Sequence, residues 1–367
     1  MMKQKILVFG MTDNPGGVES VIMNYYRNID RNRIQFDFLC NYNKIAYEKE
    51  IKSLGGNIFY ITARKANFIK FRKDLYNFMS KHAKEYSVFW VNVCSLVNID
   101  YLVCAKKYGI PKIIIHCHNS DNDGNNIKKI IHSFNRMRLK KYATDFWSCS
   151  DKASPWFFTP EIIKSSNYRV IPNAIDIEKF KKNRLVRSAM RKHYNLENKI
   201  VIGNVGRFHF QKNHKFIIDV FEQLVKRDKN YRLILVGQGS MEEEIVQKVK
   251  SKGLENEVIF CGVQSEVNNF YQMMDCFLFP SLFEGLGIAA LEAQACSLPC
   301  VLSNRVPSIV KVNDNVVFLS LDDELSAWVN AIEYLVHLDT NVFENKMEKS
   351  IYNIKTQVDF FERIIVK

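Results

Sequence analysis

The sequence predicts an α/β fold with parallel, doubly wound sheets, divided into two domains. Short apolar runs alternate with helical patterns along the chain, which is typical of parallel strands connected by helices. The chain has 367 residues, enough for two domains that each bury a core. Its hydrophobic content of 47% and its charged content of 25% are ordinary for a globular protein.

The first half begins with a near-continuous apolar run at residues 4–10, as expected of a strand that is buried on both faces. Further strands are expected at 35–41, 57–62, 86–93, 112–117 and 145–149, and helices at 43–54, 67–84, 96–108 and 126–142. A short strand and a Pro-Asn turn at 168–176 complete this half, and we interpret the turn as structural.

The second half repeats the alternation. Strands are expected at 199–206, 232–236, 257–263, 276–279, 299–303 and 316–320. Ser240 and Glu243 have the spacing of a capping box, which predicts a helix that begins after Ser240. A C-terminal helix is expected at about 341–365, with aromatic residues at Tyr352, Phe360 and Phe361.

The formal net charge of +13 is concentrated in two segments. Residues 63–84 carry seven Lys or Arg and one acid, and residues 128–141 carry six and no acid. Such faces suit nucleic acid, anionic lipid or phosphorylated substrates, although a plain solvated face has the same composition. In the first segment five apolar residues recur at helical spacing and are predicted to pack on the sheet: Phe68, Phe71, Leu75, Phe78 and Met79.

The nine cysteines are scattered, with neither a C-x-x-C pair nor a His/Cys cluster, which indicates reduced thiols in a cytosolic protein. No apolar run has the length needed to span a bilayer, and the first ten residues read as a buried strand rather than a signal peptide. We therefore expect a cytoplasmic protein, and its basic segments would allow peripheral binding to the inner face of the cell membrane.

The chain is organised around the strand at 276–279 and the loop and helix that follow it. Glu284 is expected in the loop, and Glu292 about one turn into the helix. The backbone N–H groups of Leu286, Gly287 and Ile288 would then lie at the helix N-terminus, which suits anions and hydroxyl-rich ligands. A glutamate in the first turns of a helix also complements the helix dipole, so spacing alone leaves the role of Glu292 open.

Two strand ends of the first half carry candidate residues. Gly16 and Gly17 separate strand from helix and let the backbone approach a ligand, although a plain turn has the same features and the G-x-G-x-x-G fingerprint is absent. His118 follows the strand at 112–117, where ligands of open α/β sheets bind. His116 and His118 point to one face and could share a metal, but no third ligand is evident.

Arg207 and Lys212 lie in the loop that follows the strand at 199–206. Two cations at the mouth of a strand can neutralise a diphosphate, the arginine as a bidentate fork and the lysine as a point charge. Arg and Lys are common at protein surfaces, so the spacing alone does not assign this role.

In their order along the chain, these motifs resemble the family 4 retaining glycosyltransferases. The resemblance rests on the E-x7-E spacing of Glu284 and Glu292, on Arg207 and Lys212, and on the glycine loop, the histidine and the I-P-N-x-I-D element of the first half. It implies the GT-B fold, in which two Rossmann-like domains face each other across a cleft. The expected parts are an acceptor-binding domain, a nucleotide-sugar-binding domain and a C-terminal helix that crosses back to the first domain: 1–176, 177–344 and 345–367.

The resemblance also implies a role for each residue. The catalytic residues would be His118, Glu284, Arg207 and Lys212, with the choice between His116 and His118 left open. The donor diphosphate would be bound by Gly16, Gly17, Arg207, Lys212, Gly287 and Ile288. The donor sugar would be contacted by Glu284, Gly285 and Leu286, the ribose by Glu292 and the nucleobase at Val263. The family is metal-independent, so neither a metal nor another cofactor is expected.

The implied reaction transfers a hexose-type sugar, with retention of configuration, from a nucleotide-sugar to a saccharide or a polyprenyl-diphosphate-linked acceptor. UDP is the favoured nucleotide, and the product would belong to a capsule, exopolysaccharide or lipopolysaccharide. Neither Glu284 nor His118 would be a covalent nucleophile, because the family favours front-face attack assisted by the leaving phosphate. The expected partners are therefore the donor, the acceptor and an anionic membrane surface.

Two alternatives remain. A UDP-sugar 2-epimerase has the same fold and nucleotide, but is not expected to combine Arg207 and Lys212 with this E-x7-E loop. A basic nucleic-acid-binding protein would need an exposed recognition surface of basic and aromatic residues, and the strands read instead as buried. We therefore expect no nucleic acid partner.

Overall fold

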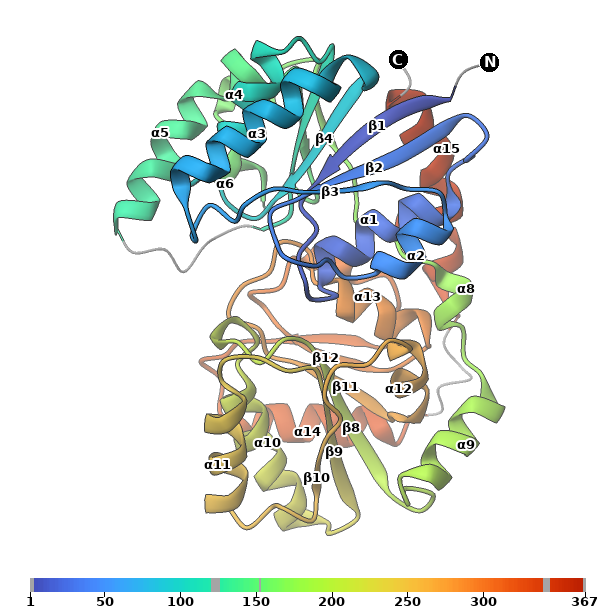
Figure 1. Cartoon of the computed structure of the whole chain (residues 1–367). Helices are drawn as coiled ribbons and strands as arrows, with labels where there is room; N and C mark the ends of the chain where they lie inside the picture. Colours follow the sequence, from blue (N-terminus) through green and yellow to red (C-terminus); the bar gives the residue numbers. More distant parts are fainter. Residues whose placement is uncertain (1–2, 120–125, 152, 339–343, 366–367) are drawn as a thin grey trace. The chain divides into compact units, whose positions relative to one another are not determined.

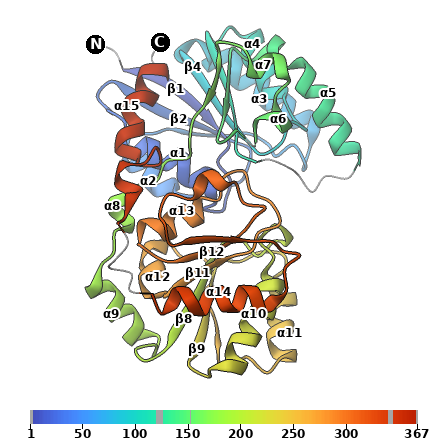
Figure 2. The ribbon, with the colours of Figure 1, turned by 180° about the vertical axis from the view of Figure 1, so that it is seen from behind.

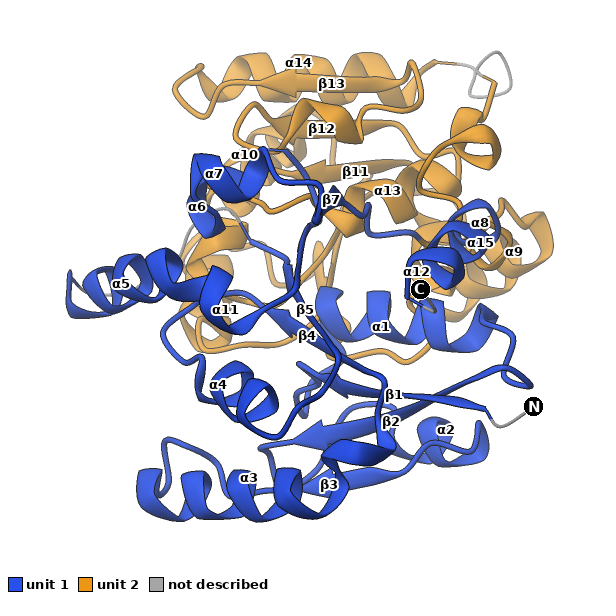
Figure 3. Cartoon of the chain, turned by 90° about the horizontal axis from the view of Figure 1, so that it is seen from above, with its two compact units in different colours: residues 1–174, 354–367 blue, residues 175–353 orange. Residues whose placement is uncertain are grey.

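The structure is a computed structural model that describes residues 3–119, 126–151, 153–338 and 344–365. The chain divides into two compact units (Figure 3): unit 1 consists of residues 1–174 and 354–367, and unit 2 of residues 175–353. The expected boundaries were 176/177 and 344/345, so unit 1 ends two residues earlier and the C-terminal segment joins it nine residues later.

Unit 1 contains a seven-stranded parallel sheet with the order β3-β2-β1-β4-β5-β6-β7 (Figure 1). Its strands are β1 (Gln4–Phe9), β2 (Ile34–Cys40), β3 (Ile58–Tyr60), β4 (Val88–Val93), β5 (Lys112–Cys117), β6 (Asp145–Ser148) and β7 (Tyr168–Val170). Its helices are α1 (Gly17–Asn28), α2 (Glu48–Ser53), α3 (Phe68–His82), α4 (Asp100–Lys107), α5 (Asn126–Tyr142), α6 (Ser154–Phe157), α7 (Pro160–Ile163) and α15 (Ile354–Ile365). Every strand that the sequence predicts for this half is present, either at its predicted length or up to three residues shorter.

The C-terminal helix α15 completes the core of unit 1, where it packs on α1 (Figure 2). The Phe361 ring stacks on that of Tyr25 with a centroid distance of 4.3 Å, and it lies 5.0 Å from Trp90 of β4. The predicted helix start at 341 is wrong: α15 begins at Ile354, because residues 346–349 form a separate 3-10 turn. Tyr352 therefore precedes the helix and its hydroxyl donates to the Ile309 carbonyl within unit 2.

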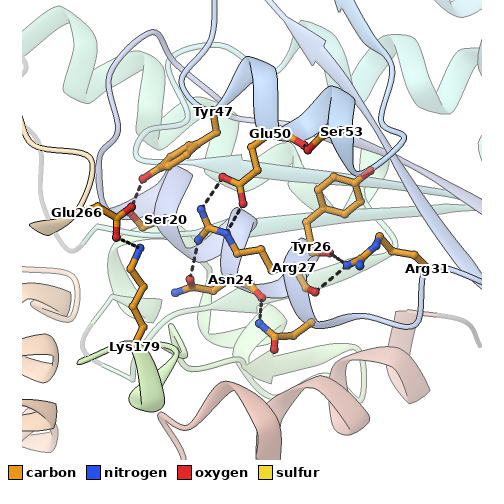
Figure 4. A network of polar contacts seen from close by, with 11 residues as sticks. Ser20, Asn24, Tyr26, Arg27, Arg31, Tyr47, Glu50, Ser53, Lys179 and Glu266 are labelled. Atoms are coloured by element: carbon orange, nitrogen blue, oxygen red, sulfur yellow. Dashed lines mark hydrogen bonds and ion pairs between the residues drawn. The ribbon is translucent and has the colours of Figure 1, made fainter. Parts of the chain in front are cut away.

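On the same side of unit 1, polar contacts tie α1 to α2 (Figure 4). The guanidinium of Arg27 donates to both carboxylate oxygens of Glu50, at 2.6 and 2.8 Å, and to the amide oxygen of Asn24 at 3.3 Å. Both side chains of this ion pair are partly buried, which favours a fixed bidentate geometry over a fluctuating surface contact. The pair thus fixes α2 beside the helix that follows the glycine loop.

Helix α3 packs mainly as the sequence predicts. Phe71, Leu75, Phe78 and Met79 are buried. The prediction is wrong for Phe68, whose ring in the first helical turn is exposed and is flanked by the guanidinium groups of two arginines.

Unit 2 contains a six-stranded parallel sheet with the order β10-β9-β8-β11-β12-β13. Its strands are β8 (Ile200–Val205), β9 (Tyr231–Val236), β10 (Val258–Phe260), β11 (Cys276–Phe279), β12 (Cys300–Ser303) and β13 (Val316–Leu319). Its helices are α8 (Ile177–Phe180), α9 (Arg184–His193), α10 (His214–Arg227), α11 (Glu242–Ser251), α12 (Val267–Met273), α13 (Ile288–Ala295) and α14 (Leu325–Val336). Helices α10 and α14 pack together, with Trp328 buried against Phe216.

The capping box predicted for Ser240 and Glu243 is absent. Helix α11 begins at Glu242, and its N-cap residue is Met241, whose side chain forms no capping hydrogen bond. The turn extends one residue further than expected because the Met241 N–H donates to the Phe208 carbonyl and the Glu242 N–H to the Gly239 carbonyl.

Candidate active site

In unit 1, the loop after β1 is shaped by Gly10 and Glu19. Gly10 has φ +125°, and a Cβ atom there would lie 2.4 Å from the Asn92 carbonyl oxygen, so only glycine permits this approach of the loop to β4. The Glu19 carboxylate accepts hydrogen bonds from the Thr12 N–H at 3.0 Å, the Thr12 hydroxyl at 2.6 Å and the Gly16 N–H at 3.1 Å. Burial raises the pKa of Glu19. The conformation of the loop is therefore stabilised by hydrogen bonds to the buried Glu19 carboxylate.

Gly16 and Gly17 lie where the sequence predicts them, as the N-cap and the first residue of α1. A Cβ atom on Gly16 would lie 2.7 Å from Oε2 of Glu19, so this glycine also makes room for the carboxylate. One of the N–H groups expected to face a diphosphate is thus already bonded to Glu19.

His118 lies just beyond the carboxyl end of β5, and its ring is almost completely buried. Its Nε2 atom is 2.9 Å from Oδ1 of Asn92, whose amide nitrogen in turn donates to the Phe9 carbonyl at 3.3 Å. Because Oδ1 can only accept, Nε2 carries the proton and Nδ1 is left as a lone-pair acceptor. Burial lowers the pKa of His118 to about 3, so the ring is neutral at physiological pH.

The other ring nitrogen, Nδ1, is buried and forms no hydrogen bond within the described part of the chain. The side chain of Asn173 lies close enough to the ring to affect its pKa. Asn173 belongs to the Pro-Asn turn that we interpreted as structural from the sequence, and the structure places it beside a candidate catalytic residue.

His116 is fully buried, with ring centroids 6.1 Å from Trp90, 5.8 Å from Trp147 and 4.2 Å from His118. Burial and the neighbouring His118 lower its pKa well below the ordinary value. Its position is that of a core residue behind His118. Across the described ranges, no group of three His, Cys, Asp or Glu side chains is arranged to hold a metal ion.

In unit 2, the loops after β8, β9 and β10 interlock through glycines. A Cβ atom on Gly237 would lie 2.2 Å from the Gly206 carbonyl oxygen, and one on Gly239 would lie 2.3 Å from that of Phe208. The Gly237 N–H also donates to the Gly262 carbonyl at 2.8 Å. This packing fixes the backbone on either side of Arg207, whose side chain is exposed. Val263 follows Gly262 and is also exposed.

Lys212 and Glu284 form an ion pair, with Nζ 2.6 Å from Oε1 and both side chains largely buried. The ammonium also lies 4.7 Å from the centroid of the Phe279 ring. Gln211 joins the same two loops, because its carbonyl accepts from the Leu282 N–H and its side chain donates to the Phe283 carbonyl. The two residues expected to contact diphosphate and sugar thus lie side by side.

Helix α13 begins where the sequence predicts. Gly287 is its N-cap residue with φ +96°, Ile288 is its first residue, and the preceding Gly285 and Leu286 are buried in the loop. Glu292 lies one turn further along the helix and accepts a hydrogen bond from the Tyr271 hydroxyl at 2.8 Å. Burial raises the pKa of Glu292 to about 7, although the Tyr271 hydrogen bond and two nearby lysines lower it.

The structure therefore brings Arg207, Lys212, Glu284 and Glu292 to the carboxyl ends of the strands of unit 2, and Gly16, Gly17 and His118 to those of unit 1. Sequence reasoning missed the partners that orient them, chiefly Asn92, Glu19 and Tyr271. Asn92 could have been found, since it lies at the end of a predicted strand. Tyr271 could not, because its pairing with Glu292 depends on how α12 packs on α13.

Comparison with known proteins decides the family. Residues 186–357 match the family model described as "Glycosyl transferases group 1". The chain is 31% identical to the protein named "Putative glycosyltransferase EpsF" of Bacillus subtilis (strain 168), over 87% of this chain and 84% of that protein. The chain belongs to the group 1 glycosyltransferases. As the sequence predicted, its fold is GT-B, the fold of the structures it resembles.

This group 1 glycosyltransferase is similar in structure to Anabaena Alr3699/HepE in complex with UDP and glucose. The TM-score is 0.79, the sequence identity is 18%, and the alignment covers 99% of each chain. In sequence, it is also 22% identical to the Escherichia coli UDP-Gal:alpha-D-GlcNAc-diphosphoundecaprenol alpha-1,3-galactosyltransferase, over 92% of this chain and 88% of that enzyme.

Proposed function

We propose that this glycosyltransferase transfers a hexose-type sugar from a UDP-sugar, with retention of configuration, to a saccharide carried on a polyprenyl diphosphate. The product would belong to a cell-surface polysaccharide. The observation that carries the proposal lies at the strand ends of unit 2, where the ion pair of Lys212 and Glu284 lies near the start of α13, and Arg207 is exposed in the loop after β8. The names of two similar proteins support the choice of nucleotide and acceptor, since one was crystallised with UDP and another acts on a diphosphoundecaprenol-linked sugar.

In this proposal the cations act on the leaving diphosphate. Arg207 forms a bidentate contact with it, and Lys212 shares its charge between the phosphate and Glu284. The N–H groups at the start of α13 add fixed partial positive charge. Together they stabilise the charge that develops as the bond between sugar and phosphate breaks, without a metal ion.

The carboxylates hold the two ends of the donor. Glu284 accepts hydrogen bonds from the sugar hydroxyls, and Glu292 accepts them from the ribose. The neutral His118 offers Nδ1 to a hydroxyl group of the donor sugar or of the acceptor. The departing phosphate deprotonates the acceptor hydroxyl, so neither Glu284 nor His118 forms a covalent bond to the sugar.

The proposal is tested by Arg207→Ala. Removal of one charge contact to a leaving diphosphate should lower kcat/KM by about a hundredfold or more. The matched control is Arg232→Ala, which removes an arginine whose guanidinium contacts only nearby backbone carbonyls among the described residues. Wild-type turnover in Arg207→Ala, with any of the UDP-sugars that the enzyme accepts, would refute the assignment.

A further inference from the structure

Helix α5 exposes an apolar face to solvent. Ile127, Ile130, Phe134 and Met137 recur at intervals of three or four residues, and each exposes between 61% and 73% of its surface. Residues at this spacing lie on one side of a helix, and Ile131 widens the same stripe. In an ordinary surface helix, this apolar stripe would face the core.

The opposite side of α5 is attached to unit 1 by polar contacts. His132 Nδ1 accepts from the Leu96 N–H at 3.2 Å, and its Nε2 donates to the Trp156 carbonyl at 3.0 Å. The Asn135 amide donates to the Leu96 carbonyl at 2.7 Å. A rotation of α5 that buried the apolar stripe would break these buried hydrogen bonds, which is costly. The outward orientation of the stripe is therefore fixed by the fold.

The charges on α5 are all of one sign, although Lys140 pairs with Glu161 and Arg136 donates to the Phe158 carbonyl. The helix carries Lys128, Lys129, Arg136, Arg138, Lys140 and Lys141 and no acidic residue. The Arg138 guanidinium lies over the ring of Phe134 at 5.0 Å, which places a cation within the apolar stripe itself. An apolar stripe edged by cations is the pattern of helices that lie in the interface of an anionic membrane.

The neighbouring helices extend this surface. Helix α4 packs against both α3 and α5, so the three form one layer (Figure 1). At the first turn of α3, Ile69 is 80% exposed, and the exposed Phe68 carries the Arg64 and Arg72 guanidiniums over its ring. The start of α3 thus adds a second group of exposed apolar and basic side chains to the layer that contains α5.

We propose that α5 is the membrane-contact helix of this enzyme and that its apolar face inserts among the headgroups of an anionic bilayer. A second copy of the chain is disfavoured as the occupant, because two such helices would bring like charges together and neither carries an acidic residue to offset them. No helix within the described residues could itself cross a membrane. The inference rests on the proposed function, since a lipid-linked acceptor would be presented at such a surface.

The test is co-sedimentation of the full chain with vesicles of phosphatidylcholine alone or mixed with phosphatidylglycerol. Wild type should bind the anionic vesicles, bind neutral ones little, and lose binding as salt is raised. The triple variant Ile130→Gln, Phe134→Gln, Met137→Gln should weaken binding to anionic vesicles by about tenfold or more, since each change removes apolar surface that the wild type would bury in the bilayer. Lys129→Glu with Lys141→Glu should weaken it through charge alone.

Leu185→Gln is the matched control, because Leu185 is 83% exposed on α9 and belongs to neither α3 nor α5. It should bind like wild type. Equal binding of the triple variant and wild type, or no wild-type binding at low salt, would overturn the inference. The inference would also be overturned if light scattering showed that the wild type is a dimer and the triple variant a monomer. UDP affinity, measured by calorimetry, should be unchanged in every variant. If the enzyme uses UDP-sugars but does not bind vesicles, the proposed function stands and only this inference is refuted.

Discussion

The neutral form of His118 is favoured chiefly by burial, and the two amides beside its ring, Asn92 and Asn173, carry no charge. Asn92 accepts from Nε2 without adding charge, and burial keeps the pKa of the ring at about 3. The imidazole can thus accept a hydrogen bond at Nδ1 throughout the physiological pH range. An aspartate at position 92 would have the same shape and a negative charge, and it would favour the protonated ring.

We therefore predict that Asn92→Asp raises the pKa of His118 and makes activity depend on pH. At pH 7 the ring would be cationic in part of the molecules, and kcat/KM should fall by roughly tenfold or more. The loss should diminish as pH rises, because the ring becomes neutral again. Asn92→Ala should lower activity without this pH dependence. Proton NMR of the ring and the pH profile of kcat/KM measure the two effects, and an unshifted profile in Asn92→Asp would show that the ring charge is irrelevant.

At the scale of elements, the interlocked loops of unit 2 explain why glycines follow β9. Gly237 has φ +132° as well as the close contact with Gly206. A side chain there must both adopt an unfavourable conformation and push the backbone beside Arg207 away. Gly253 has φ +64°, but a Cβ atom there would have no neighbouring atom within 4 Å, so this position separates the conformational effect from the steric one.

We predict that Gly237→Ala lowers the free energy of unfolding by at least about 2 kcal/mol and weakens UDP binding, because the overlap adds to the conformational strain. Gly253→Ala should cost about 1 kcal/mol and leave UDP binding intact. Urea unfolding and calorimetry measure both quantities. Equal effects of the two substitutions would mean that the close packing of the loops does not position Arg207.

The elements themselves were largely predictable, because buried parallel strands read as apolar runs and the alternation with helices is regular. Helix ends were less so: α15 begins at Ile354 and α11 has no capping box, since both starts depend on turns held by distant backbone groups. The orientation of α5 was not predictable at all. The sequence shows the apolar stripe, but it does not show that His132 and Asn135, rather than the stripe, attach the helix to the rest of unit 1.

For the candidate site too, the sequence predicts which residues take part but not how they pair. The motif residues lie at strand ends and could be chosen from the sequence, whereas the ion pair of Lys212 with Glu284 and the hydrogen bond from Tyr271 to Glu292 arise from loop and helix packing. Spacing alone did not assign the role of Glu292. In the structure, burial raises the pKa of Glu292 to about 7, although the hydrogen bond from Tyr271 lowers it.

At the scale of the whole molecule, the proposed mechanism uses protein cations, in place of a divalent metal ion, to neutralise the diphosphate. We predict that activity with a UDP-sugar survives treatment with EDTA, because Arg207, Lys212 and the start of α13 neutralise the diphosphate. The measurement is turnover before and after chelation. Activity that is lost with EDTA and restored by Mn²⁺ would require a metal ligand set that includes residues other than these.

The central claim is that unit 2 binds a nucleotide-sugar with Glu292 at the ribose and Glu284 at the sugar. It is tested most directly by calorimetric titration of wild type, Glu284→Gln and Glu292→Gln with UDP and a UDP-sugar at pH 8, above the pKa of Glu292. Glu292→Gln should weaken both ligands by about tenfold, the cost of a lost charged hydrogen bond. Glu284→Gln should spare UDP, which lacks the sugar, and impair only the UDP-sugar. The reverse order, or unchanged affinity in both variants, would contradict the account.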